Sequence, residues 1–221
     1  MNRYTLYQVL ASLCVAAFIV SAALIILSKN RSIYVRCYDN YIDTLEEQGQ
    51  GDNVLSSFEA QLNYEHMAEG FSTFFGGDIE FSGYPISKNN VEKLNQLKFY
   101  YRLAWIVVVI SFIGGIKCFY ELSKRRLYKP LLYGGLLSAF FTVIQVFVIF
   151  MSKEGTLFGL KNMILKGDYN FFAEGDILIG MLPPDFARIL LLAYILIVFI
   201  LILAMVLVRW FIQYCGRPHR F

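Results

Sequence analysis

Four long apolar runs punctuate the chain, at about residues 4–27, 100–119, 130–151 and 189–210. Each run has about the 20 residues that a helix rising ~1.5 Å per residue needs to cross ~30 Å of hydrocarbon. The pattern predicts an all-α, polytopic membrane protein with four transmembrane helices in a single domain over residues 1–221. Composition supports this prediction, because 57% of the residues are hydrophobic and only 17% are charged.

Positive charge marks the turn at 120–129, between the second and third runs, with the cations Lys124, Arg125, Arg126 and Lys129. Lysine and arginine collect on the cytoplasmic side of membrane proteins. We therefore expect a protein of the plasma membrane with both termini and this turn in the cytoplasm, and with segments 28–99 and 152–188 outside the cell. The first run could instead be a cleaved secretory signal. Its length and the absence of a small-x-small cleavage site favour an uncleaved span.

The two outer segments are expected to be helical. Tyr34, Tyr38 and Tyr41 have helical spacing and are expected to continue the first span or to lie at the headgroup level. An imperfect amphipathic helix that includes Phe58 is expected to pack on the membrane or on other outer elements. Ser87 is the expected N-cap of a helix that runs into the second span. Residues 156–164 are too short to span, and Gly and Pro interrupt 176–186, which indicates a re-entrant or interfacial half-helix.

Polar and small residues within the spans are expected to serve helix packing. Ser138, Thr142 and Gln145 are expected to make interhelical hydrogen bonds rather than a conduction path. The pairs Gly114-Gly115 and Gly134-Gly135 are expected to let the second and third spans approach closely.

Few residues suit metal or cofactor chemistry. Cys37 is the only cysteine in the outer segments, so no disulfide is expected there. The histidines, His66 and His219, are expected on opposite sides of the membrane, and no zinc spacing exists, so we expect neither a metal nor a cofactor. We expect no nucleic-acid partner either, because the positive charges sort by membrane side.

Three short stretches carry a resemblance: Ile86-Ser87 leading to Leu97-Lys98, the turn Gly167-Asp168, and the run from Asp176 to Pro183. In this order of spans and segments, the chain resembles the family of small four-span bacterial membrane proteins that includes lipoprotein intramolecular transacylase. The resemblance implies an outer-leaflet enzyme. Such an enzyme would move an ester-linked acyl chain from the diacylglycerol of a lipoprotein to the amino group of its N-terminal cysteine.

The family's pattern Glu-x-x-His-x-x-Asp-Val-Lys falls here on Asn90, Lys93, Gln96, Leu97 and Lys98, and its Phe-His pair falls on Leu160 and Lys161. Both positions of the family's histidines, the expected acid/base pair, therefore hold lysine. A solvated ammonium with a pKa of ~10.4 cannot exchange a proton near pH 7 as an imidazole does. Lys93 or Lys161 would act as a base only if burial or mutual repulsion lowered the pKa by ~3 units.

The departures favour a lipid- or lipoprotein-binding relative with lost or altered activity. The candidate lipid-binding residues are Asn90, Gln96, Lys98, Asp168 and Asp176. One alternative is an active acyltransferase that uses Lys93, Lys161 or His66, although a lone histidine is more often simply exposed or packed. Another is a non-catalytic assembly or interaction subunit. The expected partners are membrane lipids and bacterial lipoproteins, and the oligomeric state is left open.

Overall fold

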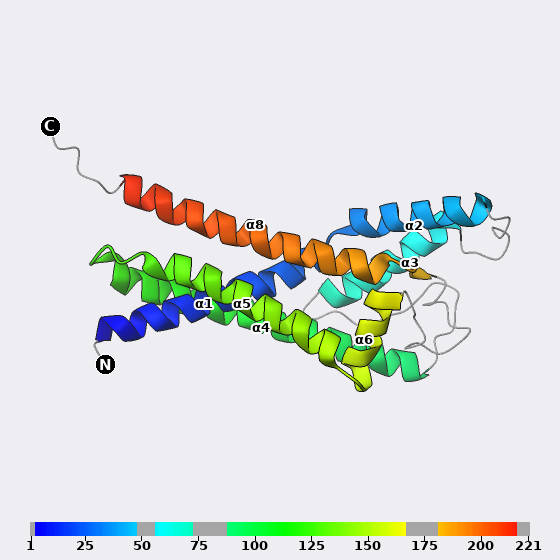
Figure 1. Cartoon of the computed structure of the whole chain (residues 1–221), viewed down its shortest axis with the longest axis horizontal. Helices are drawn as coiled ribbons and strands as arrows, with labels where there is room; N and C mark the ends of the chain where they lie inside the picture. Colours follow the sequence, from blue (N-terminus) through cyan, green and yellow to red (C-terminus); the bar gives the residue numbers. More distant parts are fainter. Residues whose placement is uncertain (1–2, 48–55, 73–87, 167–180, 216–221) are drawn as a thin grey trace. The chain divides into compact units, whose positions relative to one another are not determined.

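The structure, a computed structural model, describes residues 3–47, 56–72, 88–166 and 181–215 of the chain (Figure 1). The helices of this part are α1 (Arg3–Ser28), α2 (Arg31–Glu47), α3 (Ser57–Ser72), α4 (Lys88–Ser123), α5 (Lys129–Met151), α6 (Gly155–Lys166) and α8 (Phe186–Cys215). By length and composition, α1, α4, α5 and α8 are able to cross a membrane. The predicted all-α membrane protein with four spans is confirmed.

The chain divides into two compact units. The first unit consists of Met1–Leu24, Leu103–Val146 and Tyr194–Phe221, and the second of Ile25–Arg102 and Phe147–Ala193. The divisions fall within α1, α4, α5 and α8, so each unit contains part of every spanning helix. The organisation into one membrane domain stays a prediction.

Glycines let the helices of the first unit approach closely. A Cβ added to Gly134 of α5 would lie 2.5 Å from the Cβ of Val15 in α1, which is closer than such atoms can come. A Cβ at Gly135 would meet Ile202 of α8 at 3.2 Å, and one at Gly114 of α4 would meet Cys14 of α1 at 3.2 Å. The glycines of the second and third spans therefore face α1 and α8, whereas we expected them to bring those two spans together.

Three polar side chains of α5 form hydrogen bonds within the first unit. The Tyr194 hydroxyl of α8 donates to the Gln145 side-chain oxygen of α5 at 2.8 Å, as expected for an interhelical hydrogen bond. Ser138 donates to the Gly135 carbonyl at 2.7 Å, and Thr142 donates to the Ser138 carbonyl at 2.9 Å. These last two bonds stay within α5, where they satisfy hydroxyl groups at membrane depth.

The turn from α4 to α5 begins with a Schellman motif, in which the last turn of a helix closes through a left-handed residue. The Leu127 amide donates to the Leu122 carbonyl at 3.1 Å, and the Arg126 amide donates to the Ser123 carbonyl at 2.9 Å. Arg126 has a φ of 54°, the left-handed conformation that usually selects glycine at this position. Leu127 packs against a buried cluster that contains Leu122, which is the hydrophobic contact typical of the motif.

The helices α2 and α3 belong to the second unit, and hydrogen bonds mark where each of them begins. After α1 ends, the Asn30 amide donates to the Leu27 carbonyl, and α2 begins afresh at Arg31 instead of continuing the first span. At the start of α3, the Glu59 amide donates to the Ser56 hydroxyl and the Ser56 amide donates to the Glu59 carboxylate, each at 3.3 Å, which is a capping box.

The buried face of α3 differs from the expected one. Ala60, Asn63 and Tyr64 are buried, whereas Phe58 is 74% exposed. Met67 packs against the same core, so the buried face combines apolar and polar residues. Packing against another predicted outer element is nevertheless confirmed, because Tyr64 stacks on Tyr34 of α2.

Candidate functional site

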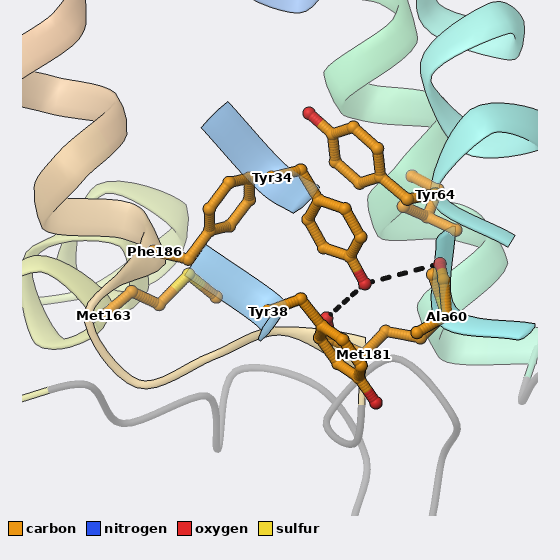
Figure 2. Packing of buried hydrophobic residues seen from close by; sticks show 8 residues of the cluster. Tyr34, Tyr38, Ala60, Tyr64, Met163, Met181 and Phe186 are labelled. Carbon is orange, nitrogen blue, oxygen red and sulfur yellow. Dashed lines mark hydrogen bonds between the residues drawn. The ribbon is translucent and has the colours of Figure 1, made fainter. Parts of the chain in front are cut away.

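Four aromatic rings meet in the core of the second unit, and we call them the tyrosine cluster: Tyr34, Tyr38, Tyr64 and Phe186 (Figure 2). The rings of Tyr34 and Tyr64 stack in parallel with their centroids 3.8 Å apart and an interplanar angle of 1°. Phe186 presents its edge to both, at 5.4 Å from Tyr34 and 5.9 Å from Tyr64. The cluster thereby joins α2, α3 and the start of α8 through aromatic contacts.

The Tyr34 hydroxyl connects two further parts of the chain. Its side chain is completely buried, and its oxygen lies 2.7 Å from the Met181 carbonyl and 3.4 Å from the Ala60 carbonyl. The shorter contact is the main hydrogen bond, because a phenol has one proton to donate. A buried tyrosine with its hydroxyl satisfied fixes the segment before α8 against α2.

Burial keeps these phenols protonated. It raises the pKa of Tyr64 to about 12, with smaller contributions from Tyr101 and Cys37. It also raises the pKa of Tyr38 to about 12, with smaller contributions from Tyr41 and Glu59. The pKa of Tyr34 is raised for the same reason, with smaller contributions from its two ring partners. The cluster is therefore neutral at physiological pH.

Alkaline pH should destabilise the second unit. Between pH 10 and about 12 the folded state holds a proton on Tyr64 that the unfolded state has released, so stability falls as the pH rises through this window. We expect the apparent Tm in uncharged detergent to decrease over that range, together with the appearance of phenolate absorbance. The variant Tyr64→Phe should show a shallower decrease. An equally steep decrease in this variant would contradict the assignment.

A cavity of about 140 Å³ adjoins the tyrosine cluster within the second unit. Its apolar wall is formed by Leu27, Met67, Ala68, Phe186 and Leu190. Three hydroxyl-bearing side chains complete the wall: Ser28, Tyr64 and Tyr101. The Ser28 hydroxyl donates to the Ile25 carbonyl at 2.8 Å, so its proton is already engaged within α1. The cavity thus suits an apolar guest rather than a charged one.

One face of α4 in this unit is polar and buried. Asn90 is 0% exposed, Leu94 3% and Lys98 5%. Their i, i+4, i+8 spacing aligns them on one side of the helix, and Leu94 belongs to the same buried core as the tyrosine cluster. Both Asn90 and Lys98 take part in interactions with neighbours, as buried polar groups require. Two of the residues predicted to bind lipid therefore lie on a single inward face.

Lys161 of α6 has a local structural role. Its ammonium donates to the Ser152 carbonyl at 3.4 Å, immediately after α5 ends, and lies 5.8 Å from the centre of the Phe158 ring. A carbonyl and an aromatic face are both partners for a positive charge. These contacts tie the start of α6 to the end of α5.

The other predicted site residues are dispersed or lie beyond the described part. Lys93 is half-buried on α4 and interacts with a neighbour, whereas His66 is exposed on α3. The backbone of Gln96 belongs to α4, but its side chain is outside the description. Asp168 and Asp176, and with them most of the predicted re-entrant half-helix, also lie outside the described residues. In the described ranges, no three His, Cys, Asp or Glu side chains gather to hold a metal ion.

Sequence reasoning missed the stacking of Tyr34 on Tyr64 and the burial of Asn63. The helical spacing of Tyr34 and Tyr38 was a usable signal, because a polar-tipped ring repeated on one helix face often marks a packed surface. Both side chains are completely buried within the second unit, and their position at the headgroup level stays a prediction. Asn63 gave no comparable signal.

Comparison with solved structures identifies the architecture. The chain matches lipoprotein intramolecular transacylase Lit from Bacillus cereus with a TM-score of 0.76 and 20% identity, over 96% of each chain. The chain has the fold of this transacylase. The resemblance seen in the sequence is thus confirmed at the level of the fold.

Two further solved structures of the Bacillus cereus transacylase also match, each with a TM-score of 0.79 and 20% identity over 97% of this chain. In one of them a histidine is replaced by arginine, and in the other the same histidine is replaced by alanine. No family model and no curated protein matches the sequence. Because identity to the transacylase is low, the likeness concerns architecture and assigns no activity.

Proposed function

We propose that this protein binds a lipid acyl chain, free or carried by a lipoprotein, on the transacylase fold, with the family's transfer chemistry lost or altered. The observation that carries the proposal is the apolar cavity beside the tyrosine cluster. Residues of the spanning helices α1, α4 and α8 line part of this cavity within the second unit. An acyl chain is the apolar ligand that membrane-spanning helices meet most often.

The volume of the cavity limits what it holds. An engineered cavity of about 150 Å³ in another protein stays dry and binds benzene. At about 140 Å³, the cavity here accommodates an apolar group of similar size. It suits the end or one segment of an acyl chain, while the remainder of the lipid stays in the bilayer.

The available acid/base groups support a binding role over transfer in the family's form. The sequence has two histidines, of which His66 is exposed, and the Lys161 ammonium donates a hydrogen bond to the Ser152 carbonyl. The two solved variants with a replaced histidine keep the same architecture, so this fold does not require that imidazole. A chain with lysine where the resemblance places the family's histidines is therefore compatible with the fold, while it lacks an imidazole at those places.

Filling the cavity should prevent acyl binding. Ala68→Phe places a ring in the space that Met67 and Leu190 also line, so cross-linking to a photoreactive fatty-acid analogue should fall at least about fivefold. Ala204→Phe is the matched control, because Ala204 is exposed on α8 in the first unit and its replacement should leave the yield unchanged. Equal cross-linking in both variants would disprove binding in this cavity.

A second experiment tests the loss of transfer chemistry. The protein would be produced in a bacterial host without its own N-terminal acylating enzyme, and lipoprotein N-termini would be examined by mass spectrometry. We expect the amino groups to stay free. If they become acylated, transfer is retained, and the variants Lys93→Ala, Lys161→Ala and His66→Ala would show which side chain is responsible.

We also propose a plasma-membrane location with both termini and the turn at 120–129 in the cytoplasm, supported by the distribution of lysine and arginine. In a protein whose natural cysteines are replaced by serine, Lys153→Cys should react with a membrane-impermeant thiol reagent added to intact cells. Lys124→Cys should react only after the cells are opened. Both positions are exposed in the structure, so the reverse pattern would invert the topology.

A further inference from the structure

The turn between α4 and α5 is an exposed cationic surface. It connects two helices able to span a membrane, so it lies at a membrane surface whichever side that is. From 119 to 130 the sequence has four cations and one carboxylate, Glu121. Glu121 forms an ion pair with Lys124 at 3.0 Å, and the turn keeps a net positive charge. We call these four exposed residues the basic turn: Lys124, Arg125, Arg126 and Lys129.

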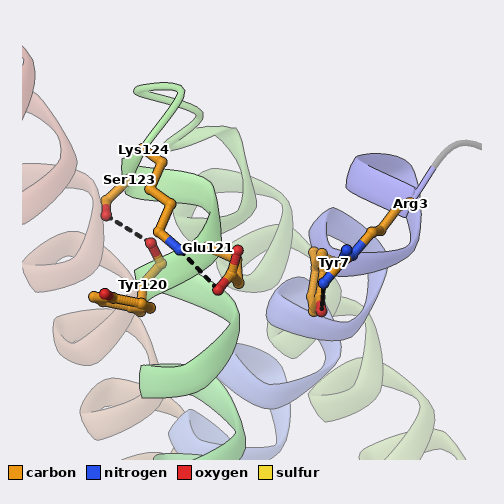
Figure 3. Close-up of polar contacts among 6 residues, drawn as sticks. All are labelled: Arg3, Tyr7, Tyr120, Glu121, Ser123 and Lys124. Atoms are coloured by element: carbon orange, nitrogen blue, oxygen red, sulfur yellow. Dashed lines mark hydrogen bonds and ion pairs between the residues drawn. The ribbon is translucent and has the colours of Figure 1, made fainter.

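Aromatic rings contact two cations of the basic turn, and Figure 3 shows one of these contacts, between Lys124 and Tyr120. The Arg125 guanidinium lies 4.0 Å from the centre of the Tyr4 ring, and the Lys124 ammonium lies 4.4 Å from the centre of the Tyr120 ring. Arg3 adds a fifth positive charge from α1, with its guanidinium donating to the Tyr7 hydroxyl at 3.4 Å. Tyrosine rings favour the headgroup level of a membrane, so these contacts keep the charges where lipid phosphates lie.

Arg126 indicates that this charge has a use beyond setting topology. It occupies the left-handed position of the Schellman motif, with a φ of 54°, where glycine would end the helix with less strain. A topological signal needs lysine or arginine near the span but not at this particular residue, and its neighbours already supply it. A strained residue at an exposed turn points to function rather than to folding.

We propose that the basic turn binds the phosphate of an anionic phospholipid headgroup, of the phosphatidylglycerol type, in the leaflet that it faces. Arg126 and Arg125 would contribute guanidinium groups, which pair with phosphate through two parallel hydrogen bonds. Lys129 begins the 23-residue helix α5, so its charge adds to the positive end of the helix dipole. This site belongs to the first unit and does not depend on acyl binding in the second.

The proposal is tested on the full-length protein in uncharged detergent. Phosphatidylglycerol, phosphatidylcholine or inorganic phosphate is titrated in, and bound lipid is counted by native mass spectrometry while the apparent Tm is recorded. Phosphatidylglycerol should raise the Tm and remain bound to the wild-type protein. Phosphatidylcholine should do neither. An equal rise with inorganic phosphate would overturn the lipid assignment in favour of a free-phosphate site.

Arg126 variants separate strain from charge. Arg126→Gly should have a higher starting Tm than the wild type, because the strain is removed, but should need at least about fivefold more phosphatidylglycerol for half of the response. Arg126→Gln, which keeps the length of the side chain without its charge, should show the same weakened response. Arg126→Lys keeps the charge without the guanidinium fork and should respond between the wild type and Arg126→Gln.

The matched control is Lys153→Gln, which removes an exposed cation just after the other end of α5. It should respond to phosphatidylglycerol like the wild type. If Arg126→Gln responds as strongly as Lys153→Gln, the basic turn is not the binding site and the proposal is wrong.

Discussion

Truncation of Tyr34 to alanine is expected to lower the free energy of unfolding of the second unit by about 3–5 kcal/mol, the range for removing a large buried ring. The ring is completely buried, stacks on Tyr64 at 3.8 Å and receives the edge of Phe186 at 5.4 Å. Its hydroxyl also donates to the Met181 carbonyl, so the truncation leaves a buried acceptor without its partner.

The reaction of Cys37 with a thiol-sensitive dye reports the unfolding of this unit. Cys37 packs against the same core, and burial, with a smaller contribution from Asp185, raises the pKa of its thiol, so little reactive thiolate exists before unfolding. With the other cysteines replaced by serine, Tyr34→Ala should lower the apparent Tm by about 10 °C or more. Tyr34→Phe keeps the ring and should cost only about 1–3 kcal/mol.

Phe58→Ala is the matched control for this experiment. It removes an aromatic ring from α3 in the same unit, but the ring is 74% exposed. The expected change is within about 0.5 kcal/mol, as for most surface substitutions. A Tm for Tyr34→Ala equal to that of Phe58→Ala would mean that the tyrosine cluster does not hold the second unit together.

Gly134→Ala is expected to destabilise the first unit by about 1–3 kcal/mol through overpacking. The new methyl group would lie 2.5 Å from the Cβ of Val15 and 2.9 Å from the Ser12 carbonyl oxygen. Neither atom is the flexible end of a side chain, so α1 and α5 must separate to admit it. Thermal unfolding in detergent, followed by the exposure of Cys14 with the other cysteines replaced, measures the effect.

Gly115→Ala is the matched control, and it is not expected to destabilise the first unit. Its methyl group would meet the Cβ of Cys14 at 3.8 Å, an ordinary van der Waals distance. Since alanine favours a helix over glycine by up to ~1 kcal/mol, this substitution should be neutral or stabilising. If both glycines respond alike, close approach at Gly134 does not determine how α1 and α5 pack.

The spanning helices were predictable because their signal is local. Apolar runs at 4–27 and 130–151 became Arg3–Ser28 and Lys129–Met151. The helix that contains the second span is longer than its apolar run. It starts at Lys88 and passes through polar residues before it reaches Tyr100. The sequence indicated this extension through Ser87, the predicted N-cap, which itself lies outside the described residues.

The candidate site could be predicted only in part, because its contacts join distant residues. Helical spacing indicated that Tyr34 and Tyr38 share a face, but the stacking of Tyr34 on Tyr64 links positions 30 residues apart. The bond from Tyr34 to Met181 spans 147 residues, and no local pattern encodes it. The family motif did direct attention to Asn90 and Lys98, which the structure places on one buried face of α4.

The outward surface of α8 has a consequence for how such proteins diverge. Only 11% of its most apolar 18-residue window is buried inside the protein, compared with 44% for α1. Hydrocarbon tails discriminate poorly among leucine, isoleucine, valine and phenylalanine, so drift between these residues is nearly unconstrained along most of this helix. The sequence of this helix can therefore change widely while the fold is retained.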